Sequence, residues 1–170
     1  VITAIIGVES RYGKHKGKYR VIDALATLGF EYPRRSKFFR SELKHFLLLS
    51  REEKIDPFSL KGSYAGAMGK PQFIASSYRE YAVDCDGDGH RDLLNNAADA
   101  MGSVANYLAR HGWQRNQAIA APANLKASAN TDNTRLKPSL TISQWQQEGI
   151  SVDQALPANH KASLIVLQQE

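Results

Sequence analysis

The sequence begins with VITAIIGVESRYG (residues 1–13), and this stretch decides how the rest of the fold is predicted. Read as a helix, it places Ile2, Ile5, Glu9 and Tyr12 on one face, because these residues recur at steps of three and four. Glu9 is therefore expected to point where the isoleucines point. Removing a carboxylate from water favours its protonated form, which is the form that a general acid needs. The residues alone leave two other interpretations open, a buried Glu9 paired with an arginine and a helix rotated so that Glu9 reaches solvent.

The composition predicts one globular core with a small appendage. The chain has 170 residues, of which 42% are hydrophobic, and its formal net charge is +5. Its basic residues are scattered, so no nucleic-acid-binding arm is expected. The single cysteine, Cys85, excludes an internal disulfide. The sequence contains no run of 18 apolar residues, so no membrane span is predicted. Both ends are expected to continue beyond these residues, and a signal peptide or lipid anchor would lie there.

Helix signals recur between residues 21 and 111. A helix that begins near residue 21 is expected to stop at Gly29, because glycine readily adopts the left-handed conformation of a helix C-cap. A longer amphipathic helix is expected to reach about Lys54. One stripe of that helix is expected to be core, formed by Phe39, Leu43, Phe46, Leu47 and Ser50. Two further helices are expected over residues 71–83 and 97–111.

Between these helices, residues 61–73 read KGSYAGAMGKPQF and contain three glycines within eight residues. Such spacing forbids regular helix and allows the backbone to approach a ligand closely. The same glycines would also suit a plain connection between two helices. The stretch is therefore expected to be a loop, and its role is left open at this point.

Residues 84–92, DCDGDGHRD, resemble an EF-hand loop, with carboxylates at positions 1, 3, 5 and 9 and glycine at position 6. The pattern predicts bound calcium. Its expected ligands are the side chains of Asp84, Asp86 and Asp88, the backbone carbonyl of His90, and Asp92 directly or through water. Position 12 departs from the pattern, because it holds Asn95 in place of the bidentate glutamate. A longer loop closed by Asp99 would repair the site, whereas the alternative is a solvated acidic turn.

The pattern changes beyond Trp113, where Ala, Asn, Ser and Thr predominate. A short helix is expected from Thr141 to Glu148, with the spacing of a capping box and a glycine stop. We therefore predict a lysozyme-like catalytic core over residues 1–113, including the calcium loop 84–99, and a small mixed α and β appendage over residues 114–170. The appendage is expected to be truncated at its C-terminus.

Several spaced motifs occur in one order along the chain. They are IIGVES (5–10), DALATL (23–28), YPRR (32–35), GSYAGAMG (62–69), QF (72–73), the loop 84–90, GSVANY (102–107) and, more thinly, ASL (162–164). Together they closely resemble the membrane-bound lytic murein transglycosylase B family. A set of motifs in order is far more specific than any one motif, and it favours Glu9 as the acid.

The resemblance implies a lysozyme-like, mainly helical core with an EF-hand-like helix-loop-helix. It also implies cleavage of the β-1,4 bond between N-acetylmuramic acid and N-acetylglucosamine in peptidoglycan, leaving a 1,6-anhydromuramoyl end. Glu9 would act first as acid and then as base, flanked by Ser63 and Gln72. Tyr107, Arg34 and Arg35 would lie along the glycan groove. The calcium ion in the loop that ends at Asp99 would be structural.

The resemblance further implies a monomer in the periplasm that binds peptidoglycan glycan strands and no nucleic acid. Attachment to the outer membrane would come only through a segment outside this chain. Three departures from the family are expected to matter. Tyr12 stands where tryptophan is common, Lys70 and Pro71 make the glycine-rich loop charged and more constrained, and the Tyr- and Asn-bearing segment that completes the groove is not among these residues.

A mechanism with one acid is chemically sound for such a reaction. Ordinary glycosidases use two carboxylates. Attack by the sugar's own 6-hydroxyl needs no activated water, so one group can protonate the leaving oxygen and then deprotonate that hydroxyl. Two alternatives stay open, a hydrolytic muramidase and a non-catalytic, calcium-stabilised glycan-binding module. The muramidase would need a second carboxylate near Glu9, supplied by Asp23, Glu31 or Asp56.

Overall fold

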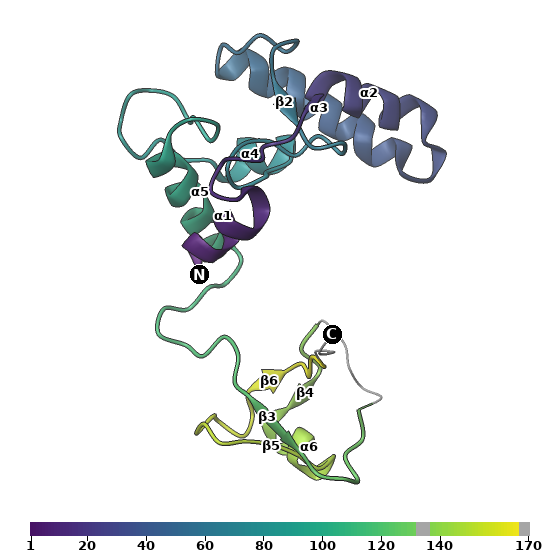
Figure 1. Ribbon diagram of the computed structural model, residues 1–170, viewed down its shortest axis with the longest axis vertical. Helices are drawn as coiled ribbons and strands as arrows, with labels where there is room; N and C mark the ends of the chain where they lie inside the picture. The colour runs from purple at the N-terminus through teal and green to yellow at the C-terminus, as the bar shows by residue number, and fades with distance from the viewer. Residues whose placement is uncertain (132–136, 167–170) are drawn as a thin grey trace. The chain divides into compact units, whose positions relative to one another are not determined.

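The structure is a computed structural model that describes residues 1–131 and 137–166. The chain forms two compact units, Val1–Gln114 and Arg115–Glu170. Figure 1 shows helices α1 to α5 in the first unit and short strands around one helix in the second. The expected mainly helical fold with a few small strands is confirmed. In the described residues, no helix is both long enough and apolar enough to cross a membrane.

Helix α1 (Ile2–Ser10) is shorter than expected and buries a different face. Its buried residues are Ile6 and Ser10, while Glu9 and Tyr12 are exposed. The predicted shared face was therefore wrong at Glu9 and Tyr12. In the last turn it is Ser10, bonded to the Lys70 carbonyl, that is buried, and Glu9 is left toward solvent. Arg11 and Tyr12 have positive φ angles of 48° and 59°, which end the helix before Tyr12. The Tyr12 ring then folds back over Gly7, where an added Cβ would lie 2.9 Å from the tyrosine hydroxyl.

Helices α2 (Val21–Glu31) and α3 (Ser36–Glu52) form a hairpin joined by the 3-10 turn η1 (Pro33–Arg35). The predicted stop at Gly29 was wrong, because α2 continues through that residue to Glu31. Gly29 instead lets α3 approach closely, since an added Cβ would meet the Arg40 side chain at 3.3 Å. The helix ends just before Pro33, where proline disfavours helical backbone in the preceding residue.

The apolar stripe of α3 is confirmed in most of its members. Phe39, Phe46 and Ser50 are buried, and Leu43 packs partly buried against the core. Leu47 was wrongly placed in this stripe, because its side chain is 48% exposed. Leu49 takes its place, since a step of three from Phe46 stays on the buried face whereas a step of one turns away from it.

Helix α4 (Ala75–Tyr81) begins later than predicted. Gln72 has a positive φ of 52°, and Phe73 forms an isolated antiparallel bridge with Met68, so neither residue is helical. Helix α5 (Ala97–Arg110) agrees with its expected bounds to one residue, and its N-cap Asn96 accepts hydrogen bonds from the first turn. The acidic loop lies between these two helices along the chain. The core beneath them is formed by Ile6, Val21, Leu25, Phe39, Phe46, Leu49, Leu60, Met68, Phe73, Ala75, Tyr78, Ala82, Leu93 and Val104.

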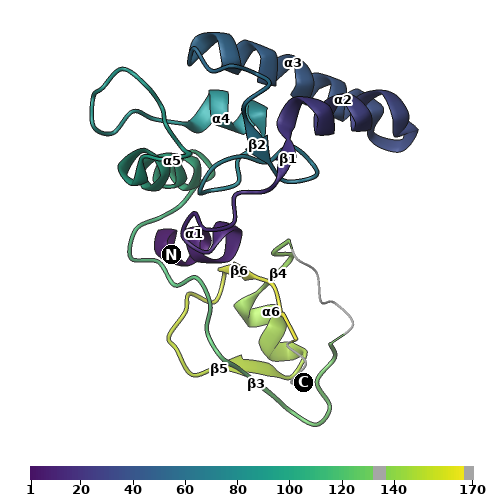
Figure 2. The ribbon, with the colours of Figure 1, turned by 45° about the horizontal axis from the view of Figure 1, so that its top comes forward.

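One two-stranded sheet in this unit joins segments that are distant in sequence. Strand β1 (Tyr19–Arg20) pairs antiparallel with β2 (Lys61–Gly62), with Tyr19 opposite Gly62 (Figure 2). The pairing brings the basic loop after α1 beside the start of the glycine-rich loop.

The described residues of the second unit form two further sheets. Strand β3 (Ala123–Leu125) pairs with β5 (Ile150–Val152), and β4 (Leu140–Thr141) pairs with β6 (Lys161–Ala162). Between them, α6 (Ile142–Gln147) has the predicted capping box, in which Thr141 and Gln144 exchange hydrogen bonds. The hydrophobic core of the second unit contains Trp145, Ile150 and Leu164.

Candidate active site and calcium loop

Glu9 lies on the exposed side of the last turn of α1. Its side chain has no hydrogen bond or ion pair with any residue in the described part of the chain. The next residue, Ser10, is buried and fixes this turn, because its hydroxyl donates to the Lys70 carbonyl over 2.6 Å and accepts from the Gly13 amide over 2.9 Å. The candidate acid is thus one residue away from a bond that ties α1 to the glycine-rich loop.

The glycine-rich loop folds onto itself and onto the chain after α1. The Ser63 hydroxyl accepts hydrogen bonds from the amides of Ala65 and Ala67 over 3.2 and 3.0 Å. The Gln72 side-chain amide donates to the carbonyls of Gly69 and Lys16 over 2.9 and 3.3 Å. Both side chains therefore hold the loop in shape, and the Ser63 hydroxyl hydrogen keeps no acceptor among the described residues.

Two of the loop's glycines are required by packing inside the protein. Gly66 and Gly69 are buried and have positive φ angles of 82° and 74°. An added Cβ would lie 2.5 Å from the Leu25 side chain at Gly66 and 2.6 Å from the Leu93 carbonyl at Gly69. These glycines let the loop approach the core closely.

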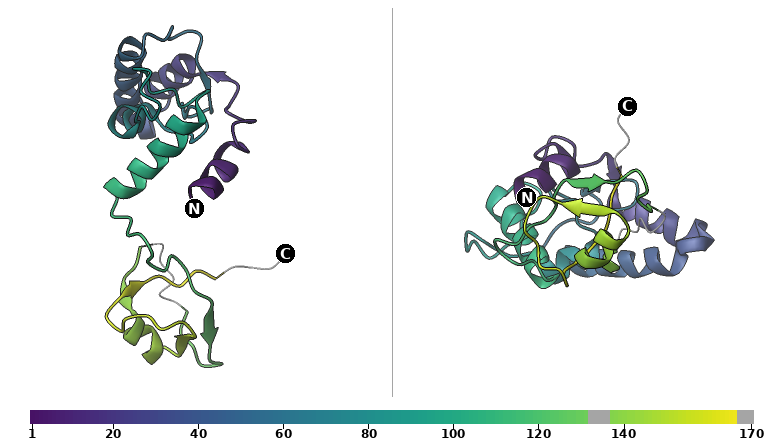
Figure 3. Two further views of the ribbon diagram at one scale, coloured as in Figure 1. Left: turned by 90° about the vertical axis from the view of Figure 1, so that its left-hand side faces the viewer. Right: turned by 90° about the horizontal axis from the view of Figure 1, so that it is seen from below.

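The other expected groove residues lie apart from one another. The Tyr107 ring, on α5, stacks on His111 at 4.0 Å between centroids and meets Tyr81 edge-on at 5.0 Å. Arg34 and Arg35 belong to η1, at the end of the α2–α3 hairpin remote from α1 (Figure 3). Arg35 lies over the Phe38 ring at 4.4 Å. The structure therefore does not bring the arginine pair next to Glu9.

The acidic loop between α4 and α5 gathers three carboxylates. Oxygen atoms of Asp84, Asp86 and Asp99 all lie within 4.8 Å of one another. Asp99 is fully buried, and its two oxygens accept hydrogen bonds from the amides of Cys85 and Asp92, each over 2.8 Å. Like charges this close repel unless a cation lies between them, and carboxylate oxygens are the ligands that calcium prefers. The residues present fit a calcium ion.

The loop is also shaped by its own backbone amides. The Asp84 carboxylate accepts from Gly87 and Gly89 over 2.7 and 2.8 Å, and the Gly89 bond is the largest cause of the lowered pKa of Asp84. The Asp88 carboxylate accepts from the His90 amide, and Asp92 caps the turn that follows the loop. Of the predicted side-chain ligands, the structure places Asp99 with Asp84 and Asp86, and this cluster does not include Asp88 or Asp92.

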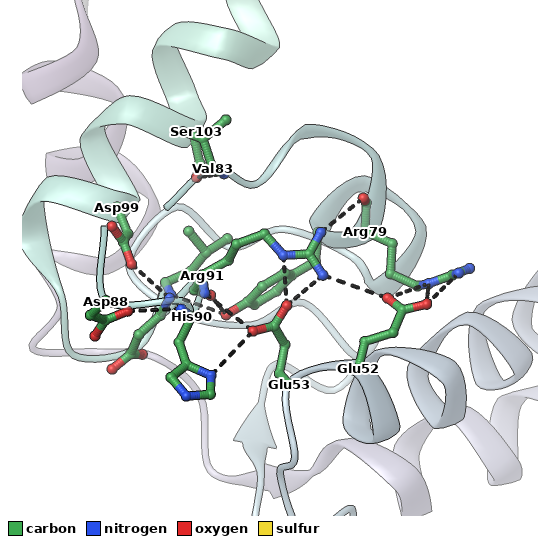
Figure 4. A network of polar contacts seen from close by, with 12 residues as sticks. Glu52, Glu53, Arg79, Val83, Asp88, His90, Arg91, Asp99 and Ser103 are labelled. Carbon is green, nitrogen blue, oxygen red and sulfur yellow. Dashed lines mark hydrogen bonds and ion pairs between the residues drawn. The ribbon is translucent and has the colours of Figure 1, made fainter. Parts of the chain in front are cut away.

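An ion-pair network that the sequence does not predict holds the C-terminal end of the acidic loop (Figure 4). The side chain of Glu53 is only 7% exposed and accepts from Arg91 Nε over 2.6 Å. Glu52 pairs with Arg79 at 2.6 Å, and this hydrogen bond is the largest cause of the lowered pKa of Glu52. No local sequence signal marks these pairs, because their members are 27 and 38 residues apart.

A second missed feature is a pair of lysines beside the glycine-rich loop. The Nζ atoms of Lys16 and Lys70 both donate to the Leu94 carbonyl, over 2.9 and 3.0 Å. The family resemblance marks Lys70 as a departure, but nothing in the sequence indicates that a lysine 54 positions away shares its acceptor.

The fold and the sequence of this chain match known transglycosylase domains. The family model described as Transglycosylase SLT domain matches residues 1–170. The membrane-bound lytic murein transglycosylase B of Escherichia coli strain K12 is 49% identical over 167 residues, covering 98% of this chain and 45% of that protein. The chain belongs to the transglycosylase SLT domain family.

Solved structures agree with this assignment. Lytic transglycosylase SltB1 from Pseudomonas aeruginosa matches with a TM-score of 0.91 at 48% identity, over 95% of this chain and 54% of that one. The Escherichia coli lytic transglycosylase Slt35 in complex with calcium gives 0.89 at 49%, over 96% and 52%. SltB3 from Pseudomonas aeruginosa in complex with NAG-NAM-pentapeptide gives 0.82 at 38%, over 97% and 45%. The chain thus spans about half the length of these relatives, and it shares their fold.

Proposed function

We propose that this chain is the catalytic part of a peptidoglycan lytic transglycosylase. It would cleave the β-1,4 bond between N-acetylmuramic acid and N-acetylglucosamine without water and leave a 1,6-anhydromuramoyl end. The single observation that carries the proposal is the bond from Ser10 to the Lys70 carbonyl. It fixes the turn that presents Glu9, an acid with no partner among the described residues, against the loop that carries Ser63 and Gln72.

In the proposed reaction, protonated Glu9 gives its proton to the glycosidic oxygen as the bond from that oxygen to the anomeric carbon breaks. The Glu9 carboxylate then takes the proton of the 6-hydroxyl while this oxygen bonds to the same carbon. The attacking group is already part of the substrate, so its effective concentration is high and no second carboxylate is needed. Ser63 and Gln72, held by the loop's own hydrogen bonds, would position the sugar.

The surroundings of the other acids favour this reaction over hydrolysis. A retaining or inverting muramidase would need a second carboxylate roughly 5 to 9.5 Å from Glu9. Of the three candidates, Asp23 is paired with Arg20 at 2.6 Å, and Glu31 ends α2 at the turn remote from α1 (Figure 3). Asp56 caps its own turn by accepting from the Phe58 amide.

The glycan-binding module is the other alternative. It would need Glu9 only as a surface residue, and the exposure of Glu9 does not exclude it. The relatives' names favour an enzyme, because each is described as a lytic transglycosylase.

We further propose that Asp84, Asp86 and Asp99 bind a structural calcium ion. The buried Asp99 and the calcium-bound Slt35 structure support this assignment. The ion would hold the loop between α4 and α5 and take no part in the chemistry, since the proposed proton transfers all use Glu9. The predicted contributions of Asp88, Asp92 and the His90 carbonyl stay predictions.

The proposed partner is the glycan strand of peptidoglycan, and the proposed location is the periplasm. The complex of SltB3 with NAG-NAM-pentapeptide and the membrane-bound relative support these proposals. Mass spectrometry of the products released from purified peptidoglycan tests the function. Anhydro ends would support it, whereas reducing ends would favour the muramidase and an absence of products the binding module.

A further inference from the structure

The two lysines that share one acceptor form an unusual cationic pair. Because Lys16 Nζ and Lys70 Nζ lie 2.9 and 3.0 Å from the same Leu94 oxygen, the two ammonium nitrogens are within about 6 Å of each other, where like charges repel. Each ammonium has three N–H donors, and the shared carbonyl uses only one from each. The pair therefore retains charge and donors for another group.

Neither lysine forms an ion pair with a carboxylate among the described residues. Asp92 acts on Lys70 electrostatically, but its oxygens accept from Leu94 and Asn95. Burial is the largest cause of the lowered pKa of Lys70, and the charge of Lys16 lowers it further. A half-buried cation beside a second cation, without its own carboxylate, is a ready site for an anion.

The pair is also held in place beside the proposed active site. The Lys70 carbonyl accepts from Ser10, which follows Glu9, and the Lys16 carbonyl accepts from Gln72. The Lys70 stem crosses Gly13, where an added Cβ would lie 3.1 Å from its Cγ. The backbone of both lysines is therefore built into the junction between α1 and the glycine-rich loop.

The surrounding loop adds to the positive field. Residues 11–20 read RYGKHKGKYR, and within the described residues only Arg20 of this stretch has an acidic partner, Asp23. Gly17 brings this loop against the start of the glycine-rich loop, since an added Cβ there would lie 1.9 Å from the Gly62 carbonyl carbon. A negatively charged part of a substrate would be attracted to this junction.

We propose that Lys16 and Lys70 together bind a carboxylate of the peptide that branches from the glycan strand, so that the site prefers strands bearing acidic peptides over bare glycan. The two oxygens of one carboxylate can accept from two ammonium groups at once, and charged hydrogen bonds of this kind are stronger than neutral ones. This proposal rests on the proposed function and names the part of the substrate that the lysine pair recognises.

The test uses the full-length protein with Glu9→Gln, so that bound substrate is not cleaved. Calorimetry measures its binding to three probes: a NAG-NAM disaccharide with a pentapeptide that has free carboxylates, the same molecule with its carboxylates amidated, and the disaccharide without peptide and with its lactyl carboxylate amidated. We expect the free-carboxylate probe to bind at least about ten-fold more tightly than the amidated one. Lys16→Gln with Lys70→Gln should remove this difference, since glutamine can still donate to Leu94 but carries no charge.

Lys14→Gln is the matched control, because it removes a charge from the same loop without touching the Leu94 carbonyl, and it should keep the difference. Lys70→Gln alone should lose most of the difference in affinity between the two probes. This single variant replaces the double variant in the test if the double variant does not fold. Equal binding of the free and amidated probes, or a preference that survives both lysine changes, overturns the proposal. Binding of the peptide-free disaccharide tests glycan recognition itself, so failure of the proposed function and failure of the lysine site give different results.

Discussion

The buried carboxylate of Asp99 accepts a hydrogen bond from the Cys85 amide over 2.8 Å, and so ties the first turn of α5 to the beginning of the acidic loop. The same helix holds the preceding residues through Ser103, whose hydroxyl accepts from the Val83 amide (Figure 4). The loop is therefore organised by α5, and a cation bound in it would stabilise the junction of two helices.

Calcium is expected to raise the melting temperature. A ligand that binds only the native state contributes about 2.7 kcal/mol at a hundred times its Kd. Asp86→Asn should abolish most of the shift, because Asp86 is exposed and belongs to the carboxylate cluster. Differential scanning calorimetry with calcium and with chelator measures this, and Asp56→Asn, outside the loop, should respond like the parent. Identical melting with calcium and with chelator would show that the site does not bind it.

Asp99 is expected to matter even without calcium. Asp99→Ala leaves the amides of Cys85 and Asp92 without their acceptor, at a cost of about 2 to 4 kcal/mol in the free energy of unfolding. Asp99→Asn keeps one acceptor oxygen and should cost less. Urea unfolding in chelator compares the two variants. A loss below about 0.5 kcal/mol for the alanine variant would mean that the loop is not held by this carboxylate.

Tyr78 gives a prediction at alkaline pH. Burial raises the pKa of its hydroxyl, which donates to the Arg91 carbonyl and accepts from the Leu93 amide over 3.0 Å. A raised native-state pKa means that its contribution to stability is fully present below the unfolded-state pKa of about 10 and is lost as pH rises above it. Stability should fall by about 1.4 kcal/mol per pH unit from this group.

Urea unfolding between pH 9 and 11 on the parent and Tyr78→Phe tests this. In the phenylalanine variant, the free energy of unfolding should fall less steeply with pH, by the contribution of one proton. Tyr64→Phe, at an exposed position, should keep the steeper dependence of the parent. Parallel slopes for the parent and Tyr78→Phe would contradict the assignment.

Ser63→Ala is expected to lower both activity and stability. The hydroxyl accepts from two loop amides, so its removal should cost about 1 kcal/mol in unfolding and loosen the loop that carries Gln72. If Ser63 also donates to the sugar, turnover should slow because the activation free energy rises by about 1 to 3 kcal/mol. Kinetics and melting on the same variant separate the two effects, and a stability loss with normal turnover would make Ser63 purely structural.

The sequence predicted the parts of the fold that depend on local signals. The capping box at Thr141, the start of α5 and the mainly helical class were all readable from spacing. It failed where tertiary contacts decide the outcome. Gly29 fits a helix stop in isolation, but α3 packs against it. Likewise, the chain reverses after Ser10, which removes Tyr12 from the predicted face, and periodicity does not contain this reversal.

The site shows the same division. The acidic loop and its repair by Asp99 could be proposed from residue spacing, and the structure brings that carboxylate to the cluster. The convergence of Lys16 and Lys70 on Leu94 could not be proposed, because it joins three segments distant in sequence.

The central claim is that Glu9 is the catalytic acid and base, and replacing Glu9 is the most direct test of it. Glu9→Gln keeps the size of the side chain but cannot donate and recover a proton, and general acid–base groups contribute roughly 10²-fold to 10⁴-fold to a rate. Because Glu9 is exposed and has no partner in the described residues, the variant should melt like the parent. Glu31→Gln, an exposed acid at the end of α2, is the matched control.

The measurement is mass spectrometry of the products from purified peptidoglycan with the full-length parent, Glu9→Gln and Glu31→Gln proteins. We predict 1,6-anhydromuropeptides from the parent and from Glu31→Gln, and release by Glu9→Gln at less than about a tenth of the parent rate. Release of the same anhydro products by Glu9→Gln above that rate would contradict the account.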